Sequence, residues 1–219
     1  MHRIVLSPHP DDAMWSCGGA IAEWARCGDA TTVVNVFDGD PARRAEDSAA
    51  FDGWPVARSG LGLADAVGRR ADGAPLYRSP LALRRRPHPA DAWLAEVLIA
   101  ALRPIVAGAD HVYAPIGHGA HVDHVLVRLA ADAVVGPGRL CLYAEFPYRV
   151  APPRELVRVD ATVDFTPWLG GGLAYRSQVA AMFGGPLAFA RTLARHARLR
   201  PDGTSRWPHW RSAPANAPV

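Results

Sequence analysis

The first forty residues alternate between short apolar runs and one stretch with helical spacing. Residues 3–7 form an apolar run that stops at Pro8, and residues 31–37 form a β-branched run, so both are predicted to be buried strands. Between them, apolar residues recur at helical spacing over residues 16–27, and Gly28 is suited to cap the helix. A strand, a helix and a strand in such close succession predict a βαβ unit, with the first strand in the interior of a parallel sheet.

The same alternation continues more weakly along the chain. The predicted elements are helices near residues 42–51, 90–102 and 122–135, and strands near residues 56–60, 111–116 and 140–145. This pattern predicts an open, Rossmann-like α/β fold with a mostly parallel sheet and helices on both faces. Residues 66–90 are predicted to be a long loop that shapes a pocket. Residues 1–219 are expected to form one domain with a Pro-rich tail from about residue 200, part of which packs through Trp207 and Trp210.

Composition excludes several classes of protein. The chain is 49% hydrophobic and 21% charged, as is typical of a globular protein, and no apolar run is long enough to span a membrane. The N-terminus lacks a signal-peptide pattern, so a soluble, cytoplasmic protein is expected. All 24 basic residues are Arg, and they are spread along the chain, which disfavours a nucleic-acid partner. The three scattered Cys residues indicate buried thiols, and a homo-oligomer is left open.

Imidazole and carboxylate side chains follow two of the predicted strands directly. Residues 7–12 read Ser-Pro-His-Pro-Asp-Asp and are predicted to be a loop after the first strand. Residues 117–124 read Gly-His-Gly-Ala-His-Val-Asp-His and follow the strand at 111–116. Open α/β sheets bind their ligands at the carboxyl ends of the strands. The two segments are therefore expected to meet over one edge of the sheet.

These residue types in this pattern indicate a metal site. Two His and one carboxylate are common ligands of catalytic zinc, which keeps one position for water. His9 and Asp12 are three residues apart, as are His121 and His124, so each pair lies on one side of a helical turn. Either motif alone has an ordinary alternative, a capping turn or a chance His pair, whereas both together favour a metal site. A carboxylate outside the ligand set can serve as general base, and Asp11 is the candidate.

With these two motifs the sequence resembles the LmbE-like or PIG-L family of zinc-dependent N-deacetylases. The signatures of that family are found at Pro8–Asp12 and at His121–His124. The resemblance implies one zinc ion per chain and the following roles: zinc ligands His9, Asp12 and His124, general base Asp11, oxyanion stabiliser or acid His121, and Asp123 to orient or tune His121. In a working mechanism, His121 is protonated. Ala13 stands where the family usually has Glu, which is expected to alter hydrogen bonding around the ligands.

The resemblance also implies the substrate, a small molecule that carries an N-acylated amino sugar. One alternative is an amidase that acts on a bulkier acyl group or on a substrate without sugar. Another is a relative that binds metal without turnover, although Asp11 and His121 argue against it; iron is an alternative metal. Three residues are candidate substrate contacts: Trp15 beside the first motif, and Asp38 and Arg43 after the second strand. Their alternatives are core packing for Trp15, a turn for Asp38 and a surface pair with Glu46 for Arg43.

Overall fold

A seven-stranded sheet forms the centre of the computed structural model, which describes residues 1–84, 86–117, 121–148, 152 and 154–212. The strand order is β3-β2-β1-β6-β7-β9-β8. The strands are β1 (His2–Ser7), β2 (Ala30–Asn35), β3 (Val56–Gly60), β6 (His111–Pro115), β7 (Leu140–Tyr143), β8 (Leu156–Asp164) and β9 (Thr204–Ser212). The segment β3-β2-β1-β6-β7 is parallel, which confirms the predicted mostly parallel sheet. His118 of the second motif lies outside the described residues.

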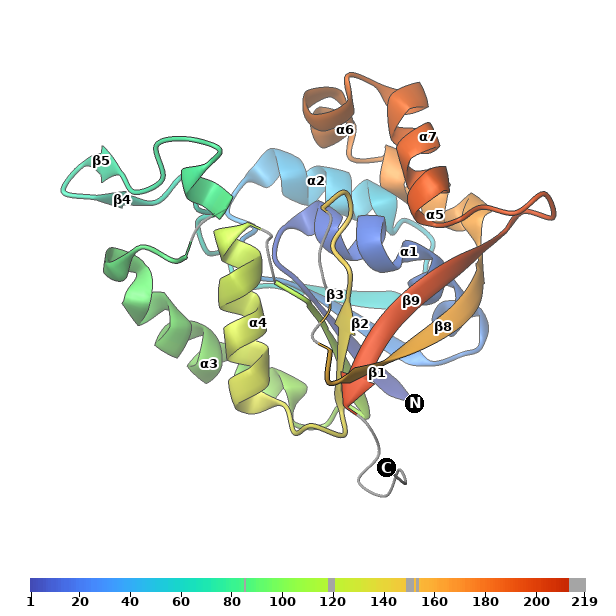
Figure 1. Cartoon of the computed structure of the whole chain (residues 1–219), viewed down its shortest axis with the longest axis horizontal. Helices are drawn as coiled ribbons and strands as arrows, with labels where there is room; N and C mark the ends of the chain where they lie inside the picture. The colour runs from blue at the N-terminus through green and yellow to red at the C-terminus, as the bar shows by residue number, and fades with distance from the viewer. Residues whose placement is uncertain (85, 118–120, 149–151, 153, 213–219) are drawn as a thin grey trace.

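Helices cover both faces of this sheet (Figure 1). They are α1 (Pro10–Arg26), α2 (Pro41–Ala50), α3 (Ala92–Val106), α4 (Val122–Val134), α5 (Phe165–Leu173), α6 (Arg176–Phe183) and α7 (Pro186–His196). One apolar core lies between the sheet and α3 and α4, and a second packs α1 with α5 and α7. The predicted α/β fold with helices on both faces is therefore confirmed. Between β3 and α3 the described chain has only short elements: β4 (Arg70–Ala71), β5 (Ala74–Pro75) and two 3-10 turns at Ala82–Arg84 and Pro89–Asp91.

Two sequence-based expectations need correction. The first helix begins at Pro10, so the predicted loop after β1 is reduced to two residues. Proline suits the first helical position because its backbone nitrogen has no hydrogen to leave unpaired there. The expected tail from about residue 200 instead contains β9, which pairs antiparallel with both β7 and β8. Trp207 and Trp210 of β9 are buried, as the sequence indicated for part of this segment.

Helix α1 is seated closely against α5 through small residues. A Cβ on Gly18 would lie 2.7 Å from Cδ1 of Trp168, and one on Gly171 would lie 2.5 Å from Cε of Met14. The Trp168 indole N–H donates to the backbone oxygen of Trp15 at 3.1 Å. Because packed interiors tolerate little added volume, these contacts fix the position of α1, which carries the first motif.

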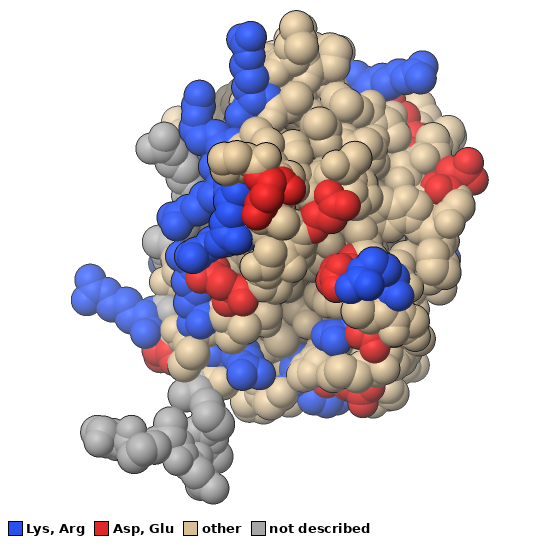
Figure 2. Space-filling view, turned by 90° about the vertical axis from the view of Figure 1, so that its right-hand side faces the viewer, with Lys and Arg blue, Asp and Glu red and all other residues tan. Residues whose placement is uncertain are grey.

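The surface is charged but not uniformly basic. Figure 2 shows basic side chains gathered toward one side of the displayed face, with acidic side chains among them and others nearer the middle of the face. Among the described residues, no helix has the length and apolar character needed to cross a membrane.

Candidate metal centre

The start of α1 is organised by the first motif itself. His9 is the N-cap residue, with φ −119° and ψ 164°, and its backbone oxygen accepts the N–H of Asp12 at 3.2 Å. In return, Oδ2 of Asp12 accepts the backbone N–H of His9 at 2.9 Å. This reciprocal capping places Asp11 and Asp12 in the first helical turn. Ala13 is fully buried and belongs to the apolar core, so the position where Glu is usual carries no polar side chain in this protein.

The second motif begins α4 at the same edge of the sheet. His121 is the N-cap of α4, and its Nδ1 accepts the backbone N–H of Asp123 at 3.3 Å. Strands β1 and β6 are parallel neighbours, with Val5 beside Tyr113, so both motifs follow strand ends that lie side by side. The predicted convergence of the two segments over one sheet edge is therefore observed.

Three of the expected ligands lie together. Ligand-type atoms of His9, Asp12 and His124 all lie within 4.8 Å of one another, and the three residues are buried. Oδ2 of Asp12 is 3.0 Å from Nδ1 of His9 and 3.2 Å from Nε2 of His124. One carboxylate oxygen thus faces both imidazoles, which is an arrangement that a divalent metal can occupy.

The polar atoms at this point fit a metal better than a protein hydrogen-bond network. Both ring nitrogens of His124 are buried and form no hydrogen bond within the described chain. Buried polar atoms are rarely left without a partner. The far nitrogens of the ligand rings face carboxylates: Nε2 of His9 lies 2.9 Å from Asp123, and Nδ1 of His124 lies 3.5 Å from Glu145. Carboxylates in this position orient metal-binding imidazoles.

Electrostatics keep the metal-free ligands charged. Burial lowers the pKa of His9, but Asp12 and Asp123 outweigh it and raise that pKa to about 9. Burial likewise opposes the effect of Asp12 on His124, whose pKa rises to about 10. Burial raises the pKa of Asp12, but His124 and His9 hold it well below its ordinary value. Without a metal, the site therefore consists of two imidazolium rings around a carboxylate.

Metal binding is expected to release about two protons per ion at pH 7. Both rings must be neutral to bind, and both are protonated below pKa values of about 9 and 10. Affinity therefore increases as pH rises toward these values and falls as pH decreases. Calorimetric titration at pH 7 in buffers of different ionisation enthalpy measures the release, and His2→Ala, which removes a partly exposed ring outside the site, should match the parent. Binding without proton release would contradict this charge state.

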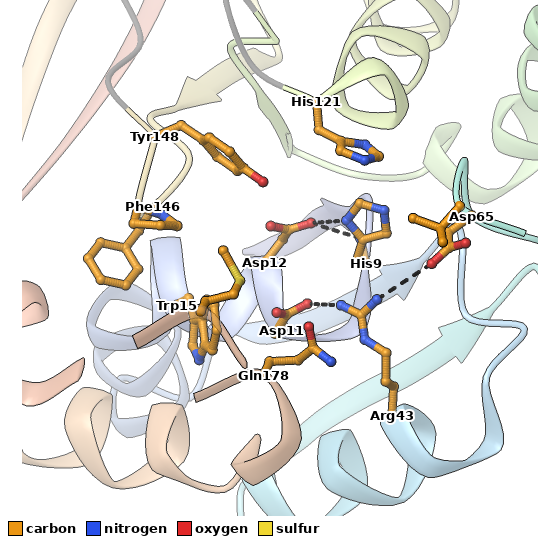
Figure 3. A pocket seen from close by; sticks show the side chains of 13 residues that line it. His9, Asp11, Asp12, Trp15, Arg43, Asp65, His121, Phe146, Tyr148 and Gln178 are labelled. Atoms are coloured by element: carbon orange, nitrogen blue, oxygen red, sulfur yellow. Dashed lines mark hydrogen bonds and ion pairs between the residues drawn. The ribbon is translucent and has the colours of Figure 1, made fainter. Parts of the chain in front are cut away.

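Asp11 lies beside the metal group but does not belong to it. Its Oδ1 forms an ion pair with Nη2 of Arg43 from α2, and Arg43 also reaches Asp65 at 3.9 Å (Figure 3). Burial raises the pKa of Asp11, while Arg43 opposes that increase, and the net direction is upward. A carboxylate with a raised pKa accepts a proton from water more readily, so the placement of Asp11 suits the expected general base.

His121 lies at the pocket opposite Asp11 (Figure 3). Burial, with the positive charge of His9 second, lowers the pKa of His121 to about 3. The ring is therefore neutral at neutral pH in the metal-free protein, which differs from the protonated His121 of the sequence-based mechanism. Because Nδ1 accepts from the backbone, Nε2 carries the hydrogen. Asp123 is closer to His9 than to His121, at 2.9 Å against 3.6 Å, so of these two rings it pairs with His9.

A cavity of about 160 Å³ lies over this group. Its polar lining residues are His9, Asp11, Asp12, Arg43, Asp65, His121 and Gln178. Its apolar side consists of Trp15, Val67, Phe146, Pro147, Tyr148 and Met182. A second cavity of about 510 Å³ adjoins it and shares Arg43, Asp65 and Val67 as lining residues.

The three candidate substrate contacts have different positions. Arg43 lines both cavities, and its Nε is buried without a hydrogen-bond partner in the described chain. Asp38 lines only the larger of the two, and its Oδ1 accepts the N–H of Gly62 at 2.7 Å. Trp15 is 1% exposed, donates to the backbone oxygen of Gly172 and packs among aromatic rings. Core packing therefore describes Trp15 better than sugar stacking.

Several residues near the site carry no assigned role from the sequence. Arg69 and Glu145 contact Asp123 and His124 respectively. The hydroxyl of Tyr148 points into the smaller cavity (Figure 3). Glu145 and Tyr148 follow β7, and their place after a parallel strand was a usable signal. Arg69 had no such signal, because it lies in a segment without periodicity.

Comparison with known proteins gives consistent results. The family model of PIG-L, described as GlcNAc-PI de-N-acetylase, matches residues 4–135. A 2′-N-acetylparomamine deacetylase from Streptomyces fradiae is 33% identical in an alignment 181 positions long, which covers 73% of this chain and 61% of that protein. The chain thus spans about three fifths of the length of this curated relative.

Two solved structures share the fold. A deacetylase of teicoplanin biosynthesis has a TM-score of 0.80 at 22% identity, over 99% of this chain and all of that one. The zinc-inhibited form of a teicoplanin deacetylase has a TM-score of 0.77 at 22% identity, with the same coverage.

Proposed function

Because the chain belongs to the PIG-L family, we propose that it is a zinc-dependent N-deacetylase. One zinc ion per chain is held by His9, Asp12 and His124, and the substrate is a small molecule that contains an N-acetylated amino sugar. The observation that carries this proposal is the buried ligand group with an additional carboxylate, Asp11, beside it at one cavity. A site that only bound metal would have no need for that carboxylate.

The bound metal supplies Lewis acidity, which polarises an amide carbonyl and lowers the pKa of water. The side chains of the protein supply the proton transfers. Asp11 takes a proton from the water molecule that attacks the carbonyl carbon, and the Nε2–H of neutral His121 donates a hydrogen bond to the oxygen that becomes negative. Arg43 holds Asp11 in place through their ion pair.

The second half of the reaction returns the proton. As the C–N bond breaks, the proton on Asp11 passes to the leaving nitrogen. The products are acetic acid and a free amine, which together contain all the atoms of the amide and the water; the acid then ionises to acetate. His121 remains neutral throughout, in agreement with a pKa lowered to about 3.

The sizes of the two cavities support a small acyl group on a larger molecule. The cavity over the metal group is about 160 Å³, whereas drug-sized ligands occupy roughly 300–1,000 Å³. The adjoining cavity of about 510 Å³ falls within that range. The acetamide is therefore placed over the metal group and the remainder of the amino sugar in the larger cavity. The name of the Streptomyces relative, an acetylparomamine deacetylase, supports this substrate class.

Activity on N-acetylated amino sugars tests the proposal directly. The protein, loaded in turn with zinc, cobalt, nickel, manganese and iron(II), is incubated with 2′-N-acetylparomamine and N-acetylglucosamine, and free amine is measured. We expect release that a chelator abolishes. We also expect turnover to fall when acetyl is replaced by hexanoyl. Faster release of the longer acyl group would favour the bulkier-acyl amidase, and no release with any metal would contradict a deacetylase. The metal series also tests zinc itself, because one structural relative is described as zinc-inhibited.

A further inference from the structure

The segment between β3 and α3 reaches the metal site through one buried arginine. Arg69 is 8% exposed although it lies in a stretch with little regular structure. Its Nη2 is 2.6 Å from Oδ1 of Asp123. Its guanidinium also stacks over the rings of Phe37 and Tyr77, at 5.2 and 5.5 Å from their centroids. Arg69 is therefore a fixed side chain within the protein and not a solvated one.

Arg69 is anchored from behind by a second carboxylate. Its Nε donates to Oδ2 of Asp91 at 2.9 Å, and the same oxygen accepts the Tyr77 hydroxyl hydrogen at 2.7 Å. Its Nη1 donates to the backbone oxygen of Ala64 at 3.2 Å. Asp91 is 1% exposed. Buried charges are retained where each is paired and hydrogen-bonded, as these are.

The two carboxylate oxygens of Asp123 contact different groups. Oδ1 faces Arg69, while Oδ2 accepts the Nε2–H of His9 and the backbone N–H of Ala66, both at 2.9 Å. The carboxylate is fully buried, so it has no water to replace a lost partner. Removal of the guanidinium would leave Oδ1 without its cation and release the rotation that now aims Oδ2 at His9.

We infer that Arg69 is a positioning residue of the metal site, which holds Asp123 against His9 and so fixes the orientation of that ligand ring. A chain of contacts connects the segment between β3 and α3 to the candidate metal ligands. It runs through Tyr77, Asp91, Arg69, Asp123 and His9. Carboxylates that accept from a metal-binding imidazole set metal affinity as well as ring orientation. The inference rests on the metal site of the proposed function, but not on any substrate.

Metal affinity tests this role without turnover. Arg69→Gln is expected to weaken metal binding by about 10–100-fold, the usual cost of losing such support. Arg69→Lys keeps the charge, but one ammonium cannot span both carboxylates, so an intermediate affinity is expected. The control is Arg78→Gln, which removes the same charge from an exposed position of the same segment and should bind metal like the parent. Dissociation constants are measured by competition with a chromogenic chelator on protein whose folding is verified by a cooperative melt.

A purely structural role predicts other results. It would lower Tm in Arg69→Gln while the metal dissociation constant of the folded protein stayed at the parent value, and that outcome overturns the inference. If Arg69→Gln does not fold, the metal affinity of Arg69→Lys is the test. A parent-like metal affinity of Arg69→Lys would also overturn the inference. Kinetics add a second test, because excess metal should restore much of kcat in Arg69→Gln, whereas damage to the pocket would raise KM at every metal concentration. Absence of deacetylation in the parent would contradict the proposed function and leave the affinity comparison intact.

Discussion

Asp11→Asn is expected to lower kcat by about 10²–10⁴-fold, the usual contribution of general acid–base catalysis. Asparagine has the shape of aspartate but cannot accept the proton of the attacking water. Asp11 lies outside the metal group, so the variant should bind metal with nearly the parent affinity and KM should change little. Steady-state kinetics with metal analysis of the same samples measures both properties.

The pH dependence of Asp11→Asn provides an independent check. Because the folded pKa of Asp11 is raised, the parent protein is expected to lose kcat as pH falls through that pKa and the carboxylate becomes protonated. The acidic limb attributable to Asp11 should be absent in the variant. Asp52→Asn changes an exposed carboxylate and serves as the matched control. An unchanged kcat in Asp11→Asn would remove Asp11 from the mechanism.

Asp12→Ala is expected to abolish stoichiometric metal binding and, with it, activity above background. Oδ2 of Asp12 is the atom that faces both ligand imidazoles. In the metal-free protein its loss leaves two buried imidazolium rings with fewer counter-charges, and it also removes the acceptor of the His9 N–H. The melting temperature of the metal-free protein should therefore decrease as well, with the lost cap alone costing about 1 kcal/mol.

Asp12→Asn separates these two effects. The amide oxygen can still accept the backbone N–H of His9, so helix capping is retained while the ligand charge is lost. Stability is expected to fall less than in Asp12→Ala, but metal binding should fail in both. Glu23→Ala, near the other end of α1, is the matched control. One metal ion per chain in purified Asp12→Asn would show that Asp12 is not an essential ligand.

The convergence of the candidate ligands could be predicted because they lie on two short segments with local signals. Each segment directly follows a parallel strand, and the sheet brings those strand ends together. The contacts of Arg69 could not be predicted, since they depend on how an aperiodic segment folds back over α4. The neutral state of His121 also follows from burial and neighbouring charges, which the spacing of residues does not encode.

Several elements of the fold were not predicted because their residues have little intrinsic preference for helix or strand. Helix α5 reads Phe-Thr-Pro-Trp-Leu-Gly-Gly-Gly-Leu, with one Pro and three Gly residues, so it has little intrinsic helical preference. It forms against α1, where glycines permit close approach. Strand β9 contains Pro208 among polar residues, a composition typical of a loop or an edge. The burial of Trp15 depends on Gly172 of α5 and on the rings of Phe183 and Phe189 in α6 and α7, which is why sugar stacking and core packing were indistinguishable beforehand.

The insertion of β9 between β7 and β8 has a consequence for biosynthesis. Until residues 204–212 have left the ribosome, β7 has no neighbour on that side and the indole of Trp207 cannot reach the Ser16 carbonyl of α1. The nascent chain then exposes the unpaired edge of β7 while most of the sheet can already form. Unpaired strand edges pair readily with other chains. Yield in a cell should therefore depend on how soon β9 becomes available to β7, so slow codons just before residues 204–212 should favour aggregates over native protein.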